Sequence, residues 1–271
     1  MRKLSGEPVA SASSLVSPAT GAVGQERPLL LYLPGMDGTG TLFYRQAQAL
    51  QREFRIRPLS LNHPEAGDSW ETLADWVGSQ LEAGAYLCGE SFGACLALLV
   101  AAQWPERCRG LILVNPASSL RRRPWWWAGH VLLPFLPPAL YHQLSERGLG
   151  ALAELSQMEP PDRERLRQAV HSVEPTVAAQ RLALLGSFVV EKLPLESMTL
   201  PTLLVAGGRD RLLPSVQEVG RLAERLPQAQ IEISPQSGHA CLLERRMNLR
   251  RYLLKPDGLF APLLLNSASA H

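Results

Sequence analysis

Short apolar runs separated by stretches of helical pattern restrict the fold of this 271-residue chain more than any other feature. Runs of four to eight apolar residues are typical of buried strands, and their alternation with helices is typical of a parallel sheet. The sequence therefore predicts an α/β protein with a doubly wound, mostly parallel sheet covered on both faces. The expected strands are residues 29–33, 54–61, 85–88, 111–114, 202–206 and 231–233. The expected helices are residues 42–51, 70–82, 92–103, 216–226 and 240–254.

One long interval lacks a strand pattern and separates the fourth expected strand from the fifth. Its segments 162–173 and 176–190 have apolar residues at helical spacing, so we expect an inserted helical cap. The expected organisation is a leader without fixed structure, a core in two parts, a cap and a tail. These are residues 1–26, residues 27–116 with 200–255, residues 117–199 and residues 256–271.

Composition excludes several classes of partner. The formal net charge of +2 and the lack of basic runs interleaved with aromatic residues argue against nucleic acid. The four cysteines lack CxxC spacing, so we expect reduced, structural thiols and no metal. No stretch offers the ~20 apolar residues of a membrane span, and the first residues lack the apolar core of a secretory signal. We expect a cytoplasmic protein without a cofactor, and leave peripheral membrane contact and the oligomeric state open.

A serine between two glycines lies where a strand pattern gives way to a helix pattern, in Gly89-Glu90-Ser91-Phe92-Gly93. A sharp strand-to-helix turn crowds its central residue and requires neighbours without side chains, which Gly89 and Gly93 provide. The alternative is a Gly/Ser-rich loop, but the flanking elements favour a nucleophile elbow with Ser91 at its tip.

A serine nucleophile needs a general base and a group that orients this base, both later in the chain in this architecture. His239 directly follows the last expected strand and is the best candidate for the base, and its structural alternative is a lone surface histidine. The other histidines precede the serine, fall in the insertion or end the chain: His63, His130, His142, His171 and His271.

Asp210 is the best candidate for the orienting acid, because it follows a buried strand and a glycine turn. Its structural alternative is an ion pair with Arg209 or Arg211. Two other carboxylates are less suitable: Asp162 is expected to be a helix N-cap in the insertion, and Glu232 lies in a strand.

Attack on a carbonyl also requires N–H donors for the developing oxyanion. The backbone N–H of Phe92 is one candidate, and the glycine loop at residues 33–40 offers another, with Gly35 allowing the N–H of Met36 to point inward. A phosphate-binding loop is the alternative, but no Lys-Ser/Thr pair follows Gly40.

Taken together, these motifs resemble the α/β-hydrolase superfamily. Residues 33–40, 89–94 and 237–242 are similar to an esterase, lipase and thioesterase group of cyanobacteria and plastids that includes the phytyl ester synthases. The resemblance covers the hydrolase-like part of those longer enzymes, which carry a further acyltransferase-like region. It implies acyl chemistry on lipid esters, including transfer of fatty acyl groups to phytol or diacylglycerol.

The insertion opens with basic and aromatic residues, Arg121 to Trp127, followed by an apolar segment that contains Phe135. Basic residues beside tryptophans suit contact with anionic lipid at a membrane interface. Packing in the cap or lining of an acyl pocket is an equal alternative. The residues concerned are Trp125, Trp126, Trp127 and Phe135.

The sequence therefore predicts a serine hydrolase that cleaves acyl esters or thioesters of a lipid-like small molecule through an acyl-enzyme. The alternatives are acyl transfer to an alcohol and, in another class, a non-catalytic lipid-binding protein on the same fold. Ser91 excludes the related dehalogenases and epoxide hydrolases, which have an aspartate at the elbow. Residues 62–68 fit the NHxxxxD pattern of glycerolipid acyltransferases, which we interpret as accidental because they fall in a turn.

Overall fold

The computed structural model describes residues 27–122 and 129–268, with one six-stranded sheet in the order β2-β1-β3-β4-β5-β6. Every neighbouring pair of strands is parallel. The strands are β1 (Leu29–Leu33), β2 (Arg55–Pro58), β3 (Ala85–Glu90), β4 (Cys108–Val114), β5 (Thr202–Gly207) and β6 (Ala229–Ser234). The sheet is thus parallel throughout and contains all six expected strands.

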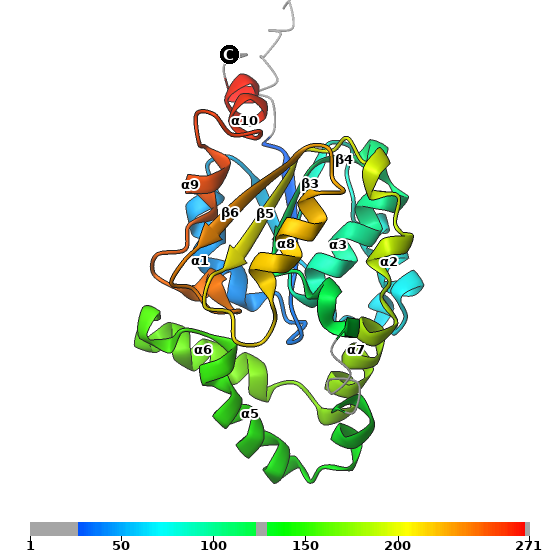
Figure 1. Ribbon diagram of the computed structural model, residues 1–271, viewed down its shortest axis with the longest axis vertical. Coiled ribbons are helices and arrows are strands. Elements are labelled where there is room, and N and C mark those ends of the chain that lie inside the picture. The colour runs from blue at the N-terminus through cyan, green and yellow to red at the C-terminus, as the bar shows by residue number, and fades with distance from the viewer. Residues whose placement is uncertain (1–26, 123–128, 269–271) are drawn as a thin grey trace, which may run out of the picture.

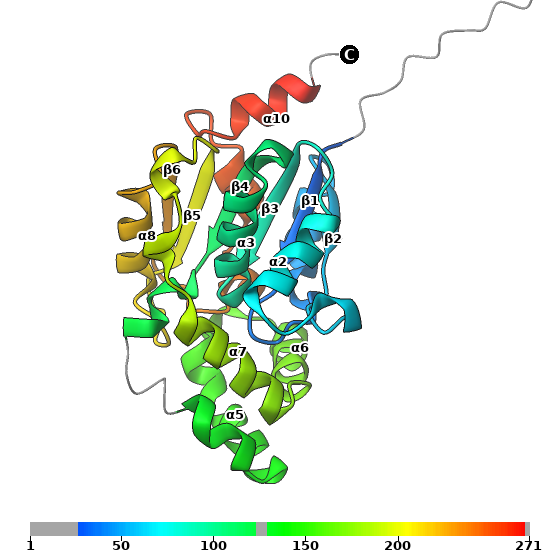
Figure 2. The ribbon, with the colours of Figure 1, turned by 90° about the vertical axis from the view of Figure 1, so that its right-hand side faces the viewer.

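Helices cover both faces of the sheet (Figure 1). One face carries α2 (Trp70–Ser79), α3 (Phe92–Gln103) and α8 (Ser215–Ala223), and the other carries α1 (Tyr44–Leu50) and α9 (Leu249–Leu253). A further helix, α10 (Ala261–Ala268), lies at the end of the molecule opposite the insertion (Figure 2). No helix in residues 27–122 and 129–268 is long and apolar enough to cross a membrane.

The expected helix at residues 240–254 is wrong. The chain forms a short 3-10 helix at Cys241–Leu243 and then a separate five-residue helix, α9. The interruption has two causes: the carboxylate of Glu244 turns back to accept a hydrogen bond from the N–H of Gly238 at 2.9 Å, and Asn248 caps α9 by accepting from Arg251 N. Local hydrogen bonds therefore outweigh the helical pattern of apolar residues.

Strand β1 shows how the two faces of the sheet are filled. Because side chains alternate along a strand, Leu31 and Leu33 pack with α2 and α3, whereas Leu30 and Tyr32 pack with α1 and α9. All four are fully buried. The four cysteines are also buried and free. Strands buried on both faces of a parallel sheet are near-continuous apolar runs, as in β1 and β5.

The insertion between β4 and β5 contributes three helices, α5 (Pro138–Leu152), α6 (Pro160–His171) and α7 (Pro175–Ser187). They lie beyond the carboxyl ends of the strands (Figures 1 and 2). The expectation that Asp162 caps α6 is wrong, because Glu159 occupies the N-cap position. The buried Asp162 carboxylate instead accepts hydrogen bonds from Tyr44 and from Arg45, the latter at 2.6 Å. It therefore ties α6 to the start of α1.

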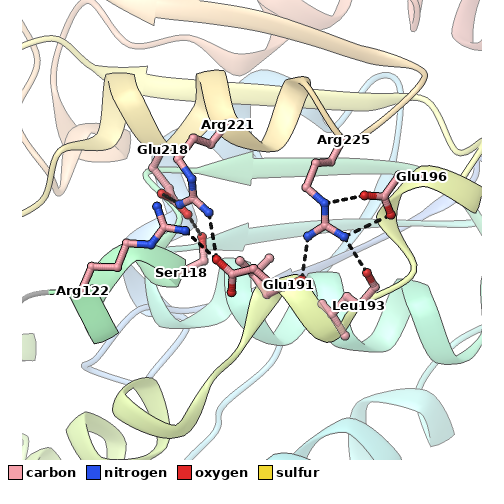
Figure 3. A network of polar contacts seen from close by, with 9 residues as sticks. Ser118, Arg122, Glu191, Leu193, Glu196, Glu218, Arg221 and Arg225 are labelled. Carbon is pink, nitrogen blue, oxygen red and sulfur yellow. Dashed lines mark hydrogen bonds and ion pairs between the residues drawn. The ribbon is translucent and has the colours of Figure 1, made fainter.

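Both ends of the insertion are fixed to α8 by a network of charged side chains (Figure 3). Glu218 of α8 is almost fully buried and accepts a hydrogen bond from Ser118, at the start of the insertion. Arg221 of α8 bonds both Glu218, at 2.5 Å, and Glu191, at 3.1 Å. Glu191 lies near the end of the insertion and also pairs with Arg122 at 2.6 Å. The two connections to the core are thus held side by side.

Candidate active site

The predicted site residues lie just after the carboxyl ends of four strands of the sheet. Met36 and Ser91 follow the adjacent strands β1 and β3, where the strand order reverses, and Asp210 and His239 follow β5 and β6. In open α/β sheets, ligands bind outside the carboxyl ends of the strands at such a reversal. The topology therefore brings together residues that are far apart in the sequence.

Ser91 lies in a strained turn between β3 and α3, with φ 54° and ψ −110°. The two flanking glycines are required by close backbone contacts. A Cβ at Gly89 would lie 2.3 Å from the carbonyl oxygen of Gly93, and a Cβ at Gly93 would lie 2.1 Å from the carbonyl oxygen of Leu33. The turn thus holds the serine side chain toward the edge of the sheet at a cost of about 1–3 kcal/mol in backbone strain.

The side chains of Ser91, His239 and Asp210 form one hydrogen-bonded chain. Ser91 Oγ lies 2.8 Å from His239 Nε2, and His239 Nδ1 lies 2.7 Å from Asp210 Oδ2. The His239 and Asp210 side chains are 4% and 1% exposed, so this chain is shielded from water.

Asp210 is held by its own loop as well as by His239. Its Oδ1 accepts the backbone N–H groups of Leu212 and Leu213 at 2.8 and 2.9 Å, and its Oδ2 accepts the hydroxyl of Ser215. Burial acts to raise the pKa of Asp210, but the hydrogen bonds and the charge of His239 outweigh burial and lower the pKa. This carboxyl is therefore ionised at neutral pH.

The alternative ion pair between Asp210 and its arginine neighbours is absent from the described residues. Arg211 and Arg209 instead approach Glu154 of the insertion, with nitrogen-to-oxygen distances of 3.3 and 3.9 Å. Glu232, the other carboxylate considered, pairs with Lys255 at 2.5 Å on β6.

The glycine loop after β1 packs against the elbow, since a Cβ at Gly35 would lie 3.6 Å from Ser91 Cβ. Neither the N–H of Met36 nor that of Phe92 donates a hydrogen bond to another residue in the described ranges. Both donors are therefore available to a ligand beside Ser91. The guanidinium of Arg181 donates a hydrogen bond to the carbonyl oxygen of Met36 at 2.7 Å.

A cavity of about 190 Å³ opens beside Ser91 and His239. Its walls come mainly from apolar side chains of the insertion and neighbouring loops: Met36, Leu42, Tyr141, Leu152, Leu166, Val170, Val173, Ala178, Leu212 and Ala240. Phe135 is not among them, because its side chain is 82% exposed on the outer surface of the insertion. Trp125, Trp126 and Trp127 lie outside the described residues.

His63, from the NHxxxxD pattern, does not line this cavity. It caps a 3-10 turn by accepting the N–H of Glu65 and stacks on Trp76 with ring centroids 5.7 Å apart. Within residues 27–122 and 129–268, no cluster of three or more His, Cys, Asp or Glu side chains is arranged to hold a metal ion.

Three buried polar residues at the site were missed by sequence analysis: Glu90, Asn115 and Arg181. Glu90 was visible inside the elbow motif, and Asn115 ends a buried strand, so position alone could have drawn attention to both. Arg181 carried no such signal, because it is one of many arginines in the insertion and its contacts depend on tertiary packing.

The fold and this arrangement of residues define an α/β hydrolase. The chain belongs to the family described as serine aminopeptidase, S33, whose pattern matches residues 70–246.

The chain is similar to several named proteins. The chain is 29% identical over 258 residues to phytyl ester synthase 1, chloroplastic, of Arabidopsis thaliana, covering 83% of this chain but only 36% of that protein. It is 26% identical over 208 residues to the pimeloyl-[acyl-carrier protein] methyl ester esterase of Nitrosomonas europaea, covering 72% and 82%. Among solved structures, a thermophilic esterase from Thermogutta terrifontis has a TM-score of 0.63 at 21% identity, covering 84% and 88%.

Proposed function

We propose that this protein is a serine esterase that cleaves carboxylic esters of apolar acyl groups through an acyl-enzyme formed on Ser91. The observation that carries the proposal is the continuous hydrogen-bonded chain from Ser91 Oγ through His239 to Asp210, 2.8 and 2.7 Å long at its two links. Ser91 and His239 also line a mostly apolar cavity.

In the first half of the proposed reaction, Ser91 Oγ attacks the carbonyl carbon while His239 Nε2 takes the hydroxyl proton. The negative charge that develops on the carbonyl oxygen is bound by the N–H groups of Met36 and Phe92. His239 then returns the proton to the leaving alcohol. Asp210 stays ionised throughout, orienting His239 and stabilising its charged form.

In the second half, water attacks the acyl group on Ser91, and the steps reverse. His239 takes a proton from the water and returns it to Ser91 Oγ, which releases the free acid. The proposed oxyanion donors are backbone groups, and the bond from Asp210 holds the proposed base at 2.7 Å, so we expect little reorganisation between the halves.

The apolar walls of the cavity favour the acyl chain as its occupant. Side chains such as Leu152, Leu166 and Val170 offer no hydrogen bonds, and each methylene group they bury contributes about 0.8 kcal/mol. A volume of about 190 Å³ suits a short to medium chain. We therefore expect turnover to rise and then fall along a series of increasing acyl length.

Acyl transfer to an alcohol is the second candidate. It uses the same acyl-enzyme and differs only in whether water or an alcohol accepts the acyl group. The 29% identity to phytyl ester synthase 1 favours testing phytol and diacylglycerol as acceptors. Because this chain spans about a third of that relative's length, the relative's whole activity is not carried over.

Peripheral contact with a membrane belongs to the same proposal. Five apolar side chains near the start of the insertion are exposed: Val131, Leu132, Phe135, Leu140 and Leu144. Exposed apolar patches on a soluble fold mark interaction surfaces, and a lipid interface would accept these side chains and supply ester substrates. Liposome flotation should weaken for the double variant Leu132→Ser and Phe135→Ser, and binding that persists unchanged would remove this part of the proposal.

The direct test compares the wild type with Ser91→Ala on aryl esters and acyl thioesters of increasing chain length, with and without phytol or diacylglycerol. Ser187→Ala is the matched control, because that serine lies on the surface of α7 and bonds only the carbonyl of Leu184. The proposal predicts turnover that Ser91→Ala abolishes and Ser187→Ala retains. Ester binding without turnover in the wild type would favour the non-catalytic alternative.

A further inference from the structure

Glu90, the residue before Ser91, has a carboxyl group that is buried without a cation. Its side chain is only 7% exposed, and its Oε2 accepts a hydrogen bond from the hydroxyl of Tyr32 at 2.7 Å. No lysine or arginine in the described residues pairs with Glu90. A buried carboxyl without such a partner costs several kcal/mol in principle, so its presence beside the nucleophile calls for a functional reason.

Glu90 is one of the residues that line the cavity beside Ser91 and His239. Its second oxygen, Oε1, makes no hydrogen bond to any residue in the described ranges, so this oxygen is free to meet a ligand. The other carboxylate on the wall, Asp37, accepts the N–H of Thr39 through its Oδ2 at 2.9 Å. Its Oδ1 makes no hydrogen bond in the described ranges, so the Glu90 variants below decide which carboxylate is the acceptor.

The charges of the cavity wall are one-sided. Asp37 and Glu90 are both acidic, and no lysine or arginine is among the lining residues that the structure describes. An anionic group on a substrate would therefore be repelled in a site of low dielectric. A neutral group that donates a hydrogen bond would instead find an acceptor in Oε1 of Glu90.

We propose that Glu90 is a specificity-determining residue whose Oε1 accepts a hydrogen bond from a hydroxyl group near the reacting ester carbonyl. The preferred substrates are then neutral hydroxy esters, and esters with an anionic group are rejected. The inference rests on the proposed esterase function. The hydroxyl belongs either to the acid or to the alcohol part of the ester, and the two sources are separated by the substrates below.

The titration of Glu90 fits this role. Burial raises the pKa of Glu90 to about 7, while the hydrogen bond from Tyr32 and the charge of His239 act to lower it. Asp37 from the loop after β1 and Glu244 from the loop after β6 also face this carboxyl and raise its pKa. The thiols of Cys88 and Cys241 are its remaining titratable neighbours. Glu90 thus gains its charge near neutral pH, which strengthens it as an acceptor.

The test measures kcat/KM for three matched pairs of esters. The alcohol pair is an ethylene glycol monoester and a propyl ester of one fatty acid. The acid pair is a β-hydroxy acid ester and its deoxy form. The charge pair is a carboxymethyl ester and its neutral methyl analogue. A preference for the hydroxy ester in the alcohol pair or in the acid pair shows which part of the ester carries the hydroxyl.

Two variants of Glu90 separate its functions. Glu90→Leu removes the acceptor and should lower the hydroxy-to-deoxy ratio about tenfold or more. Glu90→Gln keeps an acceptor oxygen without charge and should raise relative turnover of the carboxymethyl ester about tenfold. The matched control is Glu232→Gln, a buried carboxyl on β6 that pairs with Lys255 away from the cavity. It should leave every ratio unchanged.

A wild-type hydroxy-to-deoxy ratio near one, or a ratio that Glu90→Leu leaves unchanged, would overturn the proposal. If Glu90→Leu does not fold, the wild type itself is decisive, since rejection of the carboxymethyl ester should strengthen as pH rises through about 7. If turnover depends on Ser91 but the enzyme neither prefers the hydroxy esters nor rejects the carboxymethyl ester, only this inference fails. Absence of turnover that depends on Ser91 defeats the esterase proposal as well.

Discussion

The side-chain amide of Asn115 donates a hydrogen bond to the backbone carbonyl of His239, with 2.6 Å between nitrogen and oxygen. Its oxygen accepts the N–H of Gly207, at the end of the strand that leads to Asp210, at 2.7 Å. Asn115 is fully buried and has a positive φ of 45°. One side chain therefore joins the loop that carries the proposed acid to the loop that carries the proposed base.

Replacing Asn115 by alanine should weaken both the fold and the site. Two buried backbone groups lose their partner, so we expect the free energy of unfolding to fall by about 2–3 kcal/mol. Displacement of His239 should lower kcat about tenfold while KM changes little, because the cavity wall is intact. Urea unfolding and steady-state kinetics measure both, with Asn115→Gly separating the amide from the positive φ. An unchanged kcat in folded variants would restrict Asn115 to stability.

The pH dependence of stability should depend on Glu90. Burial raises the pKa of Glu90 to about 7, so the folded protein holds this proton over a range in which the unfolded chain has lost it. This contribution is full below about 4.5 and is lost as pH rises through about 7. Glutamine cannot ionise. As pH rises over this range, the free energy of unfolding of Glu90→Gln should therefore increase by roughly 3 kcal/mol relative to that of the wild type. Urea unfolding over this pH range gives the difference, and parallel curves would contradict it.

The elbow should not accept a side chain at Gly93. A Cβ there would lie 2.1 Å from the carbonyl oxygen of Leu33, and backbone atoms of the sheet cannot move aside easily. We expect Gly93→Ala to destabilise the fold by about 3 kcal/mol or more. The control is Gly148→Ala in α5, where a Cβ meets nothing within 4 Å and should stabilise the helix by about 0.5–1 kcal/mol. Equal effects of the two substitutions in thermal unfolding would refute the steric account.

Arg181 should control the loop that carries Met36. Its guanidinium donates to the carbonyl of Met36 and to the side chain of Asn62, both at 2.7 Å. Arg181→Met keeps the aliphatic stem but releases the loop, so we expect kcat to fall about tenfold through poorer binding of the oxyanion. Arg163→Met is the control, because Arg163 bonds the carbonyl of Met158 elsewhere in the insertion. Equal kcat values for the two variants would show that Arg181 does not position the loop.

The sequence was sufficient to predict the core of the fold. Strands β1 and β3 and helix α3 are nearly uniform apolar segments bounded by turns, so their pattern alone identifies them. The expected helix over residues 240–254 was wrong because Glu244 and Asn248 bind local backbone groups, and such bonds depend on the surrounding structure.

Site residues carried by short motifs were also visible in the sequence, whereas those fixed by packing were not. Ser91 and His239 follow strands within glycine-containing turns, and the structure brings them within hydrogen-bond distance. Arg181 reaches the loop after β1 only because α7 packs beside it, a contact between residues 145 positions apart. No local pattern encodes such a contact.

The central claim is that Ser91 forms a covalent acyl-enzyme. Intact-protein mass spectrometry of the purified chain, quenched in acid during turnover of an activated aryl ester, tests it most directly. We predict a mass increase of one acyl group that peptide mapping assigns to Ser91, that is lost in Ser91→Ala and that falls sharply in His239→Ala. An adduct on another residue, or aryl ester turnover that survives in Ser91→Ala, would contradict the claim.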